Sequence, residues 1–356
     1  MRRTTRVGGL GMLAGGLGIG AALASTPGIA AADASSDPLS WVDQLVSGLS
    51  VPAQTTSPLD IQISISGMDL FSTADNTATA TSGTGDIAIA IGNGADASAT
   101  GGFLDFAVAD GTNSSASTGL GADLDSAFAY GPGSQAQVGL DALLDDAFAD
   151  GTNSSSIVGL GANVDSATAV GTGSHAQVGI GASADAAFAD GTNTSADAGV
   201  GNDDLVTALG SGSSSAVSGV GNHDFASAVD GGNATAGGFF SDAFADGANS
   251  DALAIGISDT ATVFGGNAEA NASDGIGDLA SVINTGSSFD EAVAGGTSTY
   301  PLVDNDIATI IGTGSTAFAG ASPTTPGDLD LAAVFGDMLN ASATGGNFLL
   351  DIMPSL

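Results

Sequence analysis

The residues best suited to chemistry are the Asp and Asn side chains of a recurring Ala-Asp-Gly-Thr-Asn segment. The segment occupies residues 109–113, 149–153 and 189–193, so the same side chains return every forty residues. Hard cations such as Ca²⁺ take oxygen ligands from Asp carboxylates, Asn amides and backbone carbonyls. The sequence therefore predicts a cation-binding module formed by Asp110, Asp150, Asp190, Asn113, Asn153 and Asn193. The alternative is that Asp-Gly and the following Asn are ordinary turn residues.

A second set of candidate residues is aromatic. Phe128, Phe148 and Phe188 occupy one position of a repeat, and alternation along a strand places them opposite the neighbouring Ala residues. If the Ala residues fill a tight interior, the Phe residues form an exposed ladder, which predicts a partner surface or self-association. The alternative is the reverse assignment, in which the Phe residues fill the core.

Catalytic arrangements find no independent support in the sequence. His175 and His223 are the only histidines, and each lies in a predicted turn without a paired Cys or second His. Because no Lys or Arg follows Arg6, a Lys-containing phosphate loop is excluded. A polysaccharide lyase or hydrolase usually places Lys or Arg beside its catalytic acids, and this chain has neither after Arg6. We therefore predict a protein that is not an enzyme.

The elements that position these residues come from a repeat of about twenty residues. Such a fixed period indicates a repeat architecture. Within residues 126–142, period-two alternation predicts two strands, with Ala127 and Ala129 sharing one face. Gly at each corner permits a positive φ in a tight turn. The predicted fold class is all-β, a parallel β-solenoid (β-roll) with coils of about twenty residues, a short N-terminal helix and a C-terminal cap. The repeated corner glycines are Gly111, Gly131, Gly151, Gly171 and Gly191, and then Gly119, Gly139, Gly159, Gly179, Gly199 and Gly219.

A position that accepts only Ala is one without room, so the Ala pairs are expected inside. Val138, Val158 and Val178 are expected there as well. At twenty residues a coil, residues 86–351 allow about 13 coils and a rod of roughly 60 Å. The aliphatic residues that follow the second set of corner glycines are also expected inside; they are Leu120, Leu140, Leu160, Ile180, Val200 and Val220.

Two segments carry a resemblance to a known family. Residues 87–99, I-A-I-A-I-G-N-G-A-D-A-S-A, and 166–176, S-A-T-A-V-G-T-G-S-H-A, are similar to the head repeats of YadA-like trimeric autotransporter adhesins. The resemblance implies a left-handed parallel β-roll that assembles as a trimer and binds host matrix. The Ala- and Gly-rich composition also resembles secreted repeat proteins of mycobacteria and related actinobacteria.

The charge of the chain is strongly one-sided. It has 39 acidic residues against three Arg or Lys, for a net charge of −36. Such a chain repels nucleic acid and anionic lipid surfaces, so neither is an expected partner. The absence of Cys excludes a disulfide framework.

The N-terminus has the features of a secretory signal peptide over residues 1–32. Arg2, Arg3 and Arg6 precede an apolar stretch, and Ala30-Ala31-Ala32 forms an A-x-A-type cleavage site. The alternative is a retained membrane anchor. The predicted organisation continues with a capping helix and linker over 33–58, a β-solenoid repeat domain over 59–320, and a C-terminal coil and cap over 321–356. Within these, we expect a helix over 39–49 and a half-buried strand over 59–66 that starts the roll.

These features together predict an exported acidic protein with a structural or adhesive role at the cell surface, in the cell envelope or outside the cell. A host or envelope surface component is the expected partner. No membrane span is expected in the mature chain, since the apolar C-terminal segment 348–353 is too short to cross a bilayer. Ca²⁺ is the only cofactor that the sequence suggests.

Overall fold

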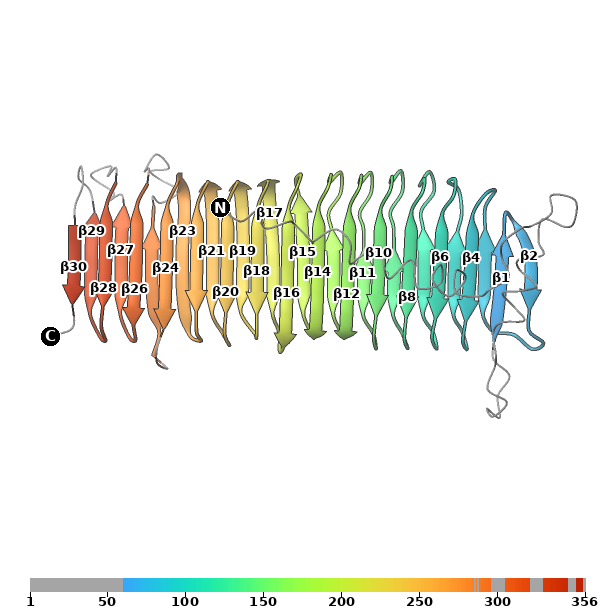
Figure 1. Ribbon diagram of the computed structural model, residues 1–356, viewed down its shortest axis with the longest axis horizontal. Coiled ribbons are helices and arrows are strands. Elements are labelled where there is room, and N and C mark those ends of the chain that lie inside the picture. Colours follow the sequence, from blue (N-terminus) through green and yellow to red (C-terminus); the bar gives the residue numbers. More distant parts are fainter. Residues whose placement is uncertain are drawn as a thin grey trace, which may run out of the picture. The chain divides into compact units, whose positions relative to one another are not determined.

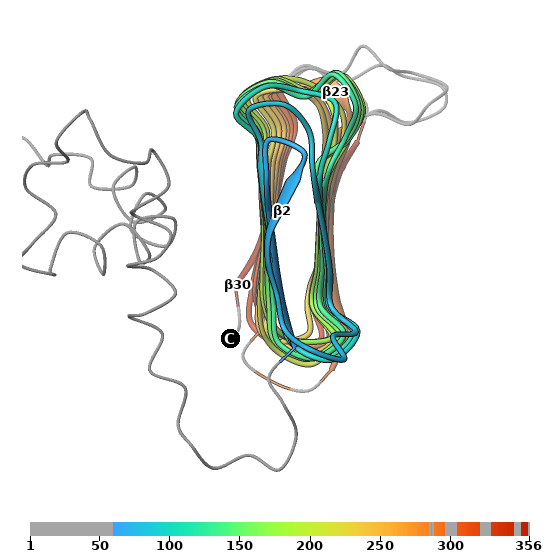
Figure 2. The same cartoon turned by 90° about the vertical axis from the view of Figure 1, so that its right-hand side faces the viewer.

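The computed structural model describes residues 60–284, 286, 288–295, 305–320, 329–344 and 350–354. Residues 58–356 form one compact unit. All the elements over the described residues are strands, and they form a parallel β-solenoid of two facing sheets (Figures 1 and 2). The all-β solenoid expected from the repeat is therefore confirmed. The signal peptide and the helix expected over 39–49 lie outside the described residues.

The two sheets contain alternate strands of the chain. Sheet A has 16 strands, in the spatial order β2 (Met68–Ser72), β1 (Ile61–Ile65), β4 (Ile87–Ile91), β6 (Phe106–Asp110), β8 (Ser126–Tyr130), β10 (Asp146–Asp150), β12 (Ser166–Thr172), β14 (Ala186–Thr192), β16 (Leu205–Ser211), β18 (Phe225–Val229), β20 (Asp242–Asp246), β22 (Thr260–Phe264), β24 (Leu279–Asn284), β26 (Ile307–Gly312), β28 (Leu331–Phe335) and β30 (Leu350–Pro354). Sheet B has 14 strands, in the spatial order β3 (Thr79–Ser82), β5 (Asp96–Ala99), β7 (Ser115–Thr118), β9 (Gln135–Gln137), β11 (Ser155–Ile157), β13 (His175–Val178), β15 (Ser195–Val200), β17 (Ser215–Asn222), β19 (Asn233–Phe239), β21 (Asp251–Ile257), β23 (Ala268–Ile276), β25 (Asp290–Ala294), β27 (Thr316–Gly320) and β29 (Asn340–Thr344).

Neighbouring coils pair in parallel, and like residues stack on like. In the pairing of β8 with β10, Ala127 lies beside Ala147 and Phe128 beside Phe148. Because the shift between coils is close to the sequence period, every position of the repeat becomes a column along the solenoid. Each column can therefore be treated as one surface or one layer of the interior.

The N-terminal end of sheet A departs from this parallel pattern. The half-buried strand expected over 59–66 is present as β1, but it runs antiparallel to both β2 and β4. The hairpin of β1 and β2 thus ends the sheet, and the parallel coils begin with β3 and β4. An antiparallel strand can follow its neighbour through a short turn, whereas a parallel one needs a longer crossover.

The interior consists mainly of Ala side chains. Ala127, Ala129, Ala147 and Ala149 are fully buried, and Val138, Val158 and Val178 are buried as well, as expected. Such small side chains fill little space between the two sheets. The hydrophobic core is therefore thin and long (Figure 2).

The prediction for the column that begins with Leu120 was wrong. Leu120 is 63% exposed and Val220 is 76% exposed, and the members between them are exposed too. The strand alternation stops at the preceding glycine, where the backbones of successive coils come very close. A Cβ on Gly139 would lie 2.1 Å from the carbonyl oxygen of Gly159. The chain turns there, and the next side chain points outward instead of continuing the period of two.

Each coil turns at two corners, which we name by their characteristic residues. The Asn corner comprises residues 111–114 and their equivalents in other coils, and the Leu corner comprises residues 119–125 and their equivalents. At the Asn corner, a buried Ser starts the next strand and closes the turn. Ser114 Oγ donates to the carbonyl oxygen of Gly111 at 3.0 Å, and Ser134 Oγ donates to that of Gly131 at 2.9 Å.

The forty-residue period has a steric origin at the Asn corner. Asn113, Asn153 and Asn193 have φ values of 56–57°, and Gly133 and Gly173, which take the same place in the coils between them, have φ values of 69° and 67°. The Asn153 Oδ1 atom lies over Gly133, where a Cβ would be only 2.4 Å away. Between residues 94 and 212 the alternation of Asn with Gly avoids this close contact, whereas Asn249 and Asn267 take the same place in consecutive coils further along the solenoid.

The C-terminal part continues the array. The strand pattern expected from residue 329 to 335 is confirmed by β28, and β30 pairs with it in parallel. The capping role of the last residues stays a prediction. No helix within the described ranges is long and apolar enough to cross a membrane.

The alternation at the Asn corner can be tested by shifting its phase. Gly133→Asn places three Asn residues in consecutive coils, and we expect the overpacking to lower the free energy of unfolding by about 1–3 kcal/mol. The variant Asn113→Gly/Gly133→Asn/Asn153→Gly restores alternation and should recover most of this loss. Urea unfolding followed by circular dichroism measures both. Equal stability of wild type and Gly133→Asn would contradict the steric explanation.

Candidate functional surfaces

The Asp residues expected to bind cations share one column of sheet A but are not adjacent in it. Along the column, Tyr130 separates Asp110 from Asp150, and Val170 separates Asp150 from Asp190. The Asp positions are therefore two strand spacings apart, roughly 10 Å, and a Tyr or Val side chain lies between each pair in the column.

The Asn residues at this corner have a steric role in the turn. Asn113 Oδ1 lies over Gly94 of the preceding coil, as Asn193 Oδ1 lies over Gly173. Over the residues that the structure describes, no group of three or more His, Cys, Asp or Glu side chains could hold a metal ion. Cation binding by the Asp-Gly-Thr-Asn corners stays a prediction.

The outer face of sheet A brings two of the three expected Phe residues together with other aromatic rings. Phe128 contacts Phe106 at a ring-centroid distance of 5.3 Å, and Tyr130 contacts Phe148 at 5.7 Å. Phe128 and Tyr130 are stacked at 6.3 Å. These four residues, Phe106, Phe128, Tyr130 and Phe148, form the aromatic patch. Its side chains are half-buried by one another and point away from the Ala interior.

Phe188 lies on the same face but outside the aromatic patch. Its neighbours in the column are Thr168 and Thr207. Of the three Phe residues expected to bind a partner, the structure therefore brings together Phe128 and Phe148 and leaves Phe188 separate. Their function as a partner surface stays a prediction.

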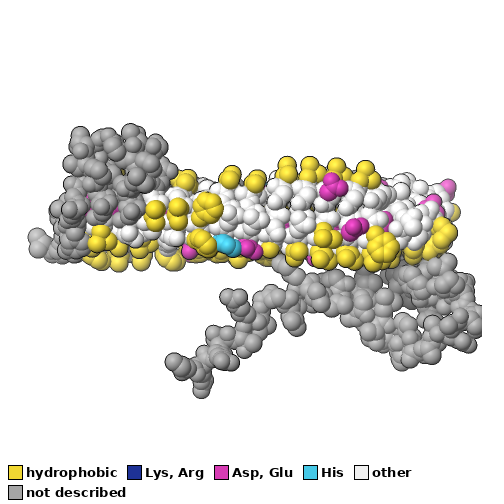
Figure 3. Space-filling model, turned by 90° about the horizontal axis from the view of Figure 1, so that it is seen from above, with side chains coloured by type: hydrophobic (Ala, Val, Ile, Leu, Met, Phe, Trp, Pro, Cys, Tyr) yellow, Lys and Arg dark blue, Asp and Glu magenta, His cyan; other side chains and the backbone are white. Residues whose placement is uncertain are grey.

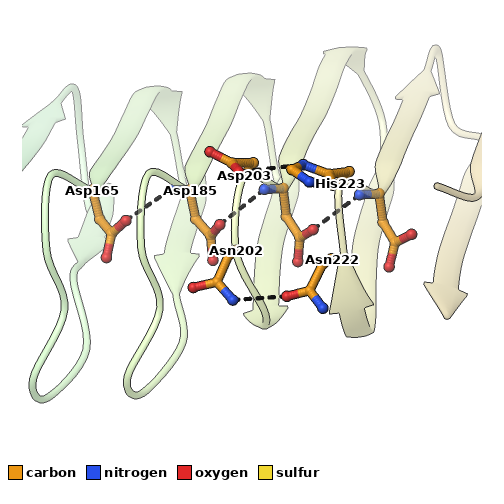
Figure 4. A network of polar contacts seen from close by, with 8 residues as sticks. Asp165, Asp185, Asn202, Asp203, Asn222 and His223 are labelled. Carbon is orange, nitrogen blue, oxygen red and sulfur yellow. Dashed lines mark hydrogen bonds and ion pairs between the residues drawn. The ribbon is translucent and has the colours of Figure 1, made fainter. Parts of the chain in front are cut away.

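A column of buried Asp residues is the main polar feature that the sequence analysis did not single out. Each member is the last residue of the Leu corner, and each is at most 2% exposed. Its Oδ1 atom accepts a hydrogen bond from the backbone N–H of the next member, at 2.7 Å from Asp185 to Asp165 and 2.8 Å from Asp204 to Asp185 (Figure 4). The buried Asp column comprises Asp86, Asp105, Asp125, Asp145, Asp165, Asp185, Asp204 and Asp224.

The carboxyls of the buried Asp column have no cationic partner. No Lys or Arg exists after Arg6, and the Oδ2 atoms of Asp105, Asp125 and Asp145 have no hydrogen-bond partner. Loss of hydration on burial is the main cause that raises the pKa of Asp125 to about 7, and the charges of Asp145, Asp105 and Asp146 raise it further. Desolvation likewise raises the pKa of Asp105 and Asp145 to about 6. These three carboxyls therefore keep their protons to a higher pH than an ordinary Asp does.

The sequence does contain a signal for this column. Asp125, Asp145, Asp165 and Asp185 recur without substitution every twenty residues, whereas the residues before them vary among Leu, Val and Ala. A polar residue that does not vary between coils indicates a fixed structural contact. The abundance of Asp in turns obscured this signal, because Asp commonly bonds to its own backbone there.

The pH dependence of stability tests the protonation of this column. Unfolded Asp has a pKa of about 3.9, so between pH 4 and 7 the folded chain keeps protons that the unfolded chain has released. The stabilisation that these raised pKa values give to the folded state is therefore fully present below about pH 4. It is lost as the pH rises through 6 to 7. We expect the free energy of unfolding to fall by at least about 3 kcal/mol from pH 5 to pH 8.

Two Asn variants test whether the pH dependence of stability comes from the buried Asp column. Asp125→Asn removes one titrating carboxyl but keeps an Oδ1 acceptor for Asp145 N–H, so it should reduce the pH dependence. Asp141→Asn changes an exposed carboxyl of the Leu corner whose charge is not among those that raise the pKa of Asp105, Asp125 or Asp145, and it should leave the dependence as in wild type. If stability were constant from pH 5 to pH 8, the column would not be protonated in the folded state.

The outer surface of the Leu corner is apolar. Leu104, Leu124, Leu144 and Val164 form one column there, and each is about half exposed. The misassigned column from Leu120 to Val220 forms a second, on the other side of the same corner. Rows of apolar side chains run along both long margins of the face in Figure 3. Neither column was expected on the surface.

The two histidines lie apart from each other, and each lies near acidic side chains. His223 Nδ1 lies 3.3 Å from Asp203 Oδ2, and its ring stacks on Phe240 at 4.8 Å (Figure 4). Beside them, Asn202 donates to Asn222 at 2.7 Å. His175 Nε2 lies 3.4 Å from Gln177 Oε1 on the outer face of sheet B. These contacts link neighbouring coils or neighbouring positions of one strand.

None of the known family models, curated proteins or solved structures matches this chain.

Proposed function

We propose that this chain is an exported, non-enzymatic repeat protein with a structural or adhesive role at the cell surface or outside the cell. The observation that carries the proposal is the aromatic patch on the outer face of sheet A. Four aromatic rings gather there on consecutive strands that hydrogen bonds hold in register. Aromatic side chains dominate the energetics of protein interfaces, since they present large rigid surfaces.

The solenoid suits a protein that presents a surface over a distance. Solenoids of stacked repeats provide extended binding surfaces, and here each coil is hydrogen-bonded to the coils before and after it. The buried polar side chains are used to hold coils and turns together, as in the buried Asp column. The side chains on the outer faces of the two sheets remain available to contact a partner.

The charge of the chain favours a partner with positive charge. No Lys or Arg follows Arg6, so ion pairs with a partner would use Asp or Glu of this chain and basic groups of the partner. Electrostatic complementarity of this kind speeds encounter and selects against acidic partners. The signal-peptide features of residues 1–32 and the resemblance of residues 87–99 to adhesin head repeats support an extracellular location and an adhesive role.

A binding assay with matched variants tests the adhesive role. The full chain is applied to immobilised extracellular-matrix proteins and to cell-envelope fractions. We expect Phe128→Ser/Phe148→Ser to weaken the binding of whichever component retains the wild type by about tenfold or more, as for interface hot spots.

Phe318→Ser provides the control, because Phe318 is an exposed aromatic residue on sheet B. It should bind as the wild type does. Circular dichroism should show unchanged folding of all three proteins. Failure of every component to retain the wild type, or equal binding by Phe128→Ser/Phe148→Ser, would contradict adhesion through the aromatic patch.

A further inference from the structure

The Leu corner carries two columns of exposed apolar side chains that the aromatic patch does not include. We call its two columns together the apolar edge. Leu124 is 48% exposed and Val164 is 59% exposed in one column, and Leu120 is 63% exposed in the other. The apolar edge comprises Leu104, Leu124, Leu144 and Val164, and then Leu120, Leu140, Leu160, Ile180, Val200 and Val220.

Four of these side chains occupy backbone positions that disfavour them. Leu104, Leu124, Leu144 and Val164 have φ values of 61–66°. Only Gly and Asn adopt this region readily, and a β-branched residue such as Val is a strong outlier there. The Asn corner uses Gly and Asn for the same conformation. The Leu corner thus has large apolar side chains at positions where Gly or Asn would cause less backbone strain. These side chains are exposed, so burial within the chain does not offset the strain.

The apolar edge is large for a surface that stays in water. Its ten side chains, between 45% and 76% exposed, present on the order of 1,000 Å² over the two columns together, and each column alone is comparable to the largest apolar patch of a typical monomer, about 300–600 Å². A standard protein interface buries about 800 Å² on each partner. The edge alone is therefore sufficient in size for a stable interface.

The spacing of the edge favours one occupant. Successive side chains of each column are separated by one strand spacing, about 4.8 Å, so only a surface with the same repeat matches the columns along their whole length. A second copy of this chain has that repeat. The exposed carboxylates of the edge over residues 119–223 are Asp123, Asp141 and Asp203, so pairing of two copies requires salt to screen their repulsion.

We propose that the apolar edge is a self-association interface, at which two copies of this chain pair edge to edge. A two-fold arrangement brings the same columns of both copies together, as is usual in homodimers. The outer faces of both sheets, including the aromatic patch, remain exposed in the pair.

Sedimentation velocity of the full chain at 0.15–0.5 M NaCl tests the proposal, since salt screens the net negative charge. We expect the wild type to dimerise in a concentration-dependent manner. Leu124→Asn/Leu144→Asn/Val164→Asn should weaken the dimer at least tenfold. The same variant should raise the melting temperature of the monomer, because Asn tolerates the positive φ better than Leu or Val.

The combination of weaker association with higher monomer stability separates an interface from a purely structural role. A second variant, Leu120→Ser/Leu140→Ser/Leu160→Ser, changes the other column and should also weaken the dimer. Leu205→Asn/Ile283→Asn, which replaces exposed aliphatic residues on sheet A, serves as the control and should dimerise as the wild type does.

Three outcomes would overturn the proposal. The first is a wild type that stays monomeric at every concentration and salt tested. The second is a dimer that persists in both edge variants, which would place the interface elsewhere. The third is a monomeric wild type that co-floats with neutral phosphatidylcholine vesicles while the edge variants do not, which would make lipid the occupant of the edge.

Discussion

The structure depends on the close approach of two β-sheets across an interior that has room for little more than methyl groups. The Ala columns, such as the one through Ala127 and Ala147, have zero exposure, and they repeat because neighbouring coils stack in register. A methyl group buries little apolar area, so each coil adds only a small hydrophobic contribution. The stability must therefore come from the number of coils and from the hydrogen bonds between them. Deletion or overfilling at one coil affects both neighbours, since coils contact only those beside them.

Both corners solve the same problem with different polar residues. The chain leaves each corner into a strand through a buried polar side chain, which is Ser or Thr at the Asn corner and mostly Asp at the Leu corner. The Ser hydroxyl is neutral, and its burial requires only a carbonyl acceptor. The Asp carboxyl is ionisable, and repeated burial in one column raises its pKa. The negative charges of neighbouring Asp residues raise the pKa of these carboxyls further.

Much of the fold follows from the sequence alone. The period near twenty residues, the inward Ala pairs and the outward Phe residues are periodic features, and periodicity is what a sequence displays directly. The side on which Leu120 lies could not be obtained in this way, because the alternation is broken by Gly119, whose backbone meets Gly139 of the next coil. The close approach of the Asn153 side chain to Gly133 and the antiparallel direction of β1 also lie outside what the period of the sequence displays. Of the candidate surfaces, the aromatic residues were predictable as an outward column. The buried Asp column and the apolar edge required the three-dimensional register.

The inside–outside assignment of one coil is the central claim, and cysteine labelling tests it most directly, because the chain has no Cys of its own. Ser156 occupies an interior position and is fully buried, and its hydroxyl donates to the carbonyl oxygen of Ala167 at 2.6 Å. Ser156→Cys is therefore a nearly isosteric interior probe, and Leu140→Cys is its counterpart on the apolar edge. In dilute native protein, the account predicts rapid reaction of a thiol reagent at residue 140 and reaction at residue 156 only after unfolding. Equal reaction rates at the two positions, or a faster rate at 156, would contradict it.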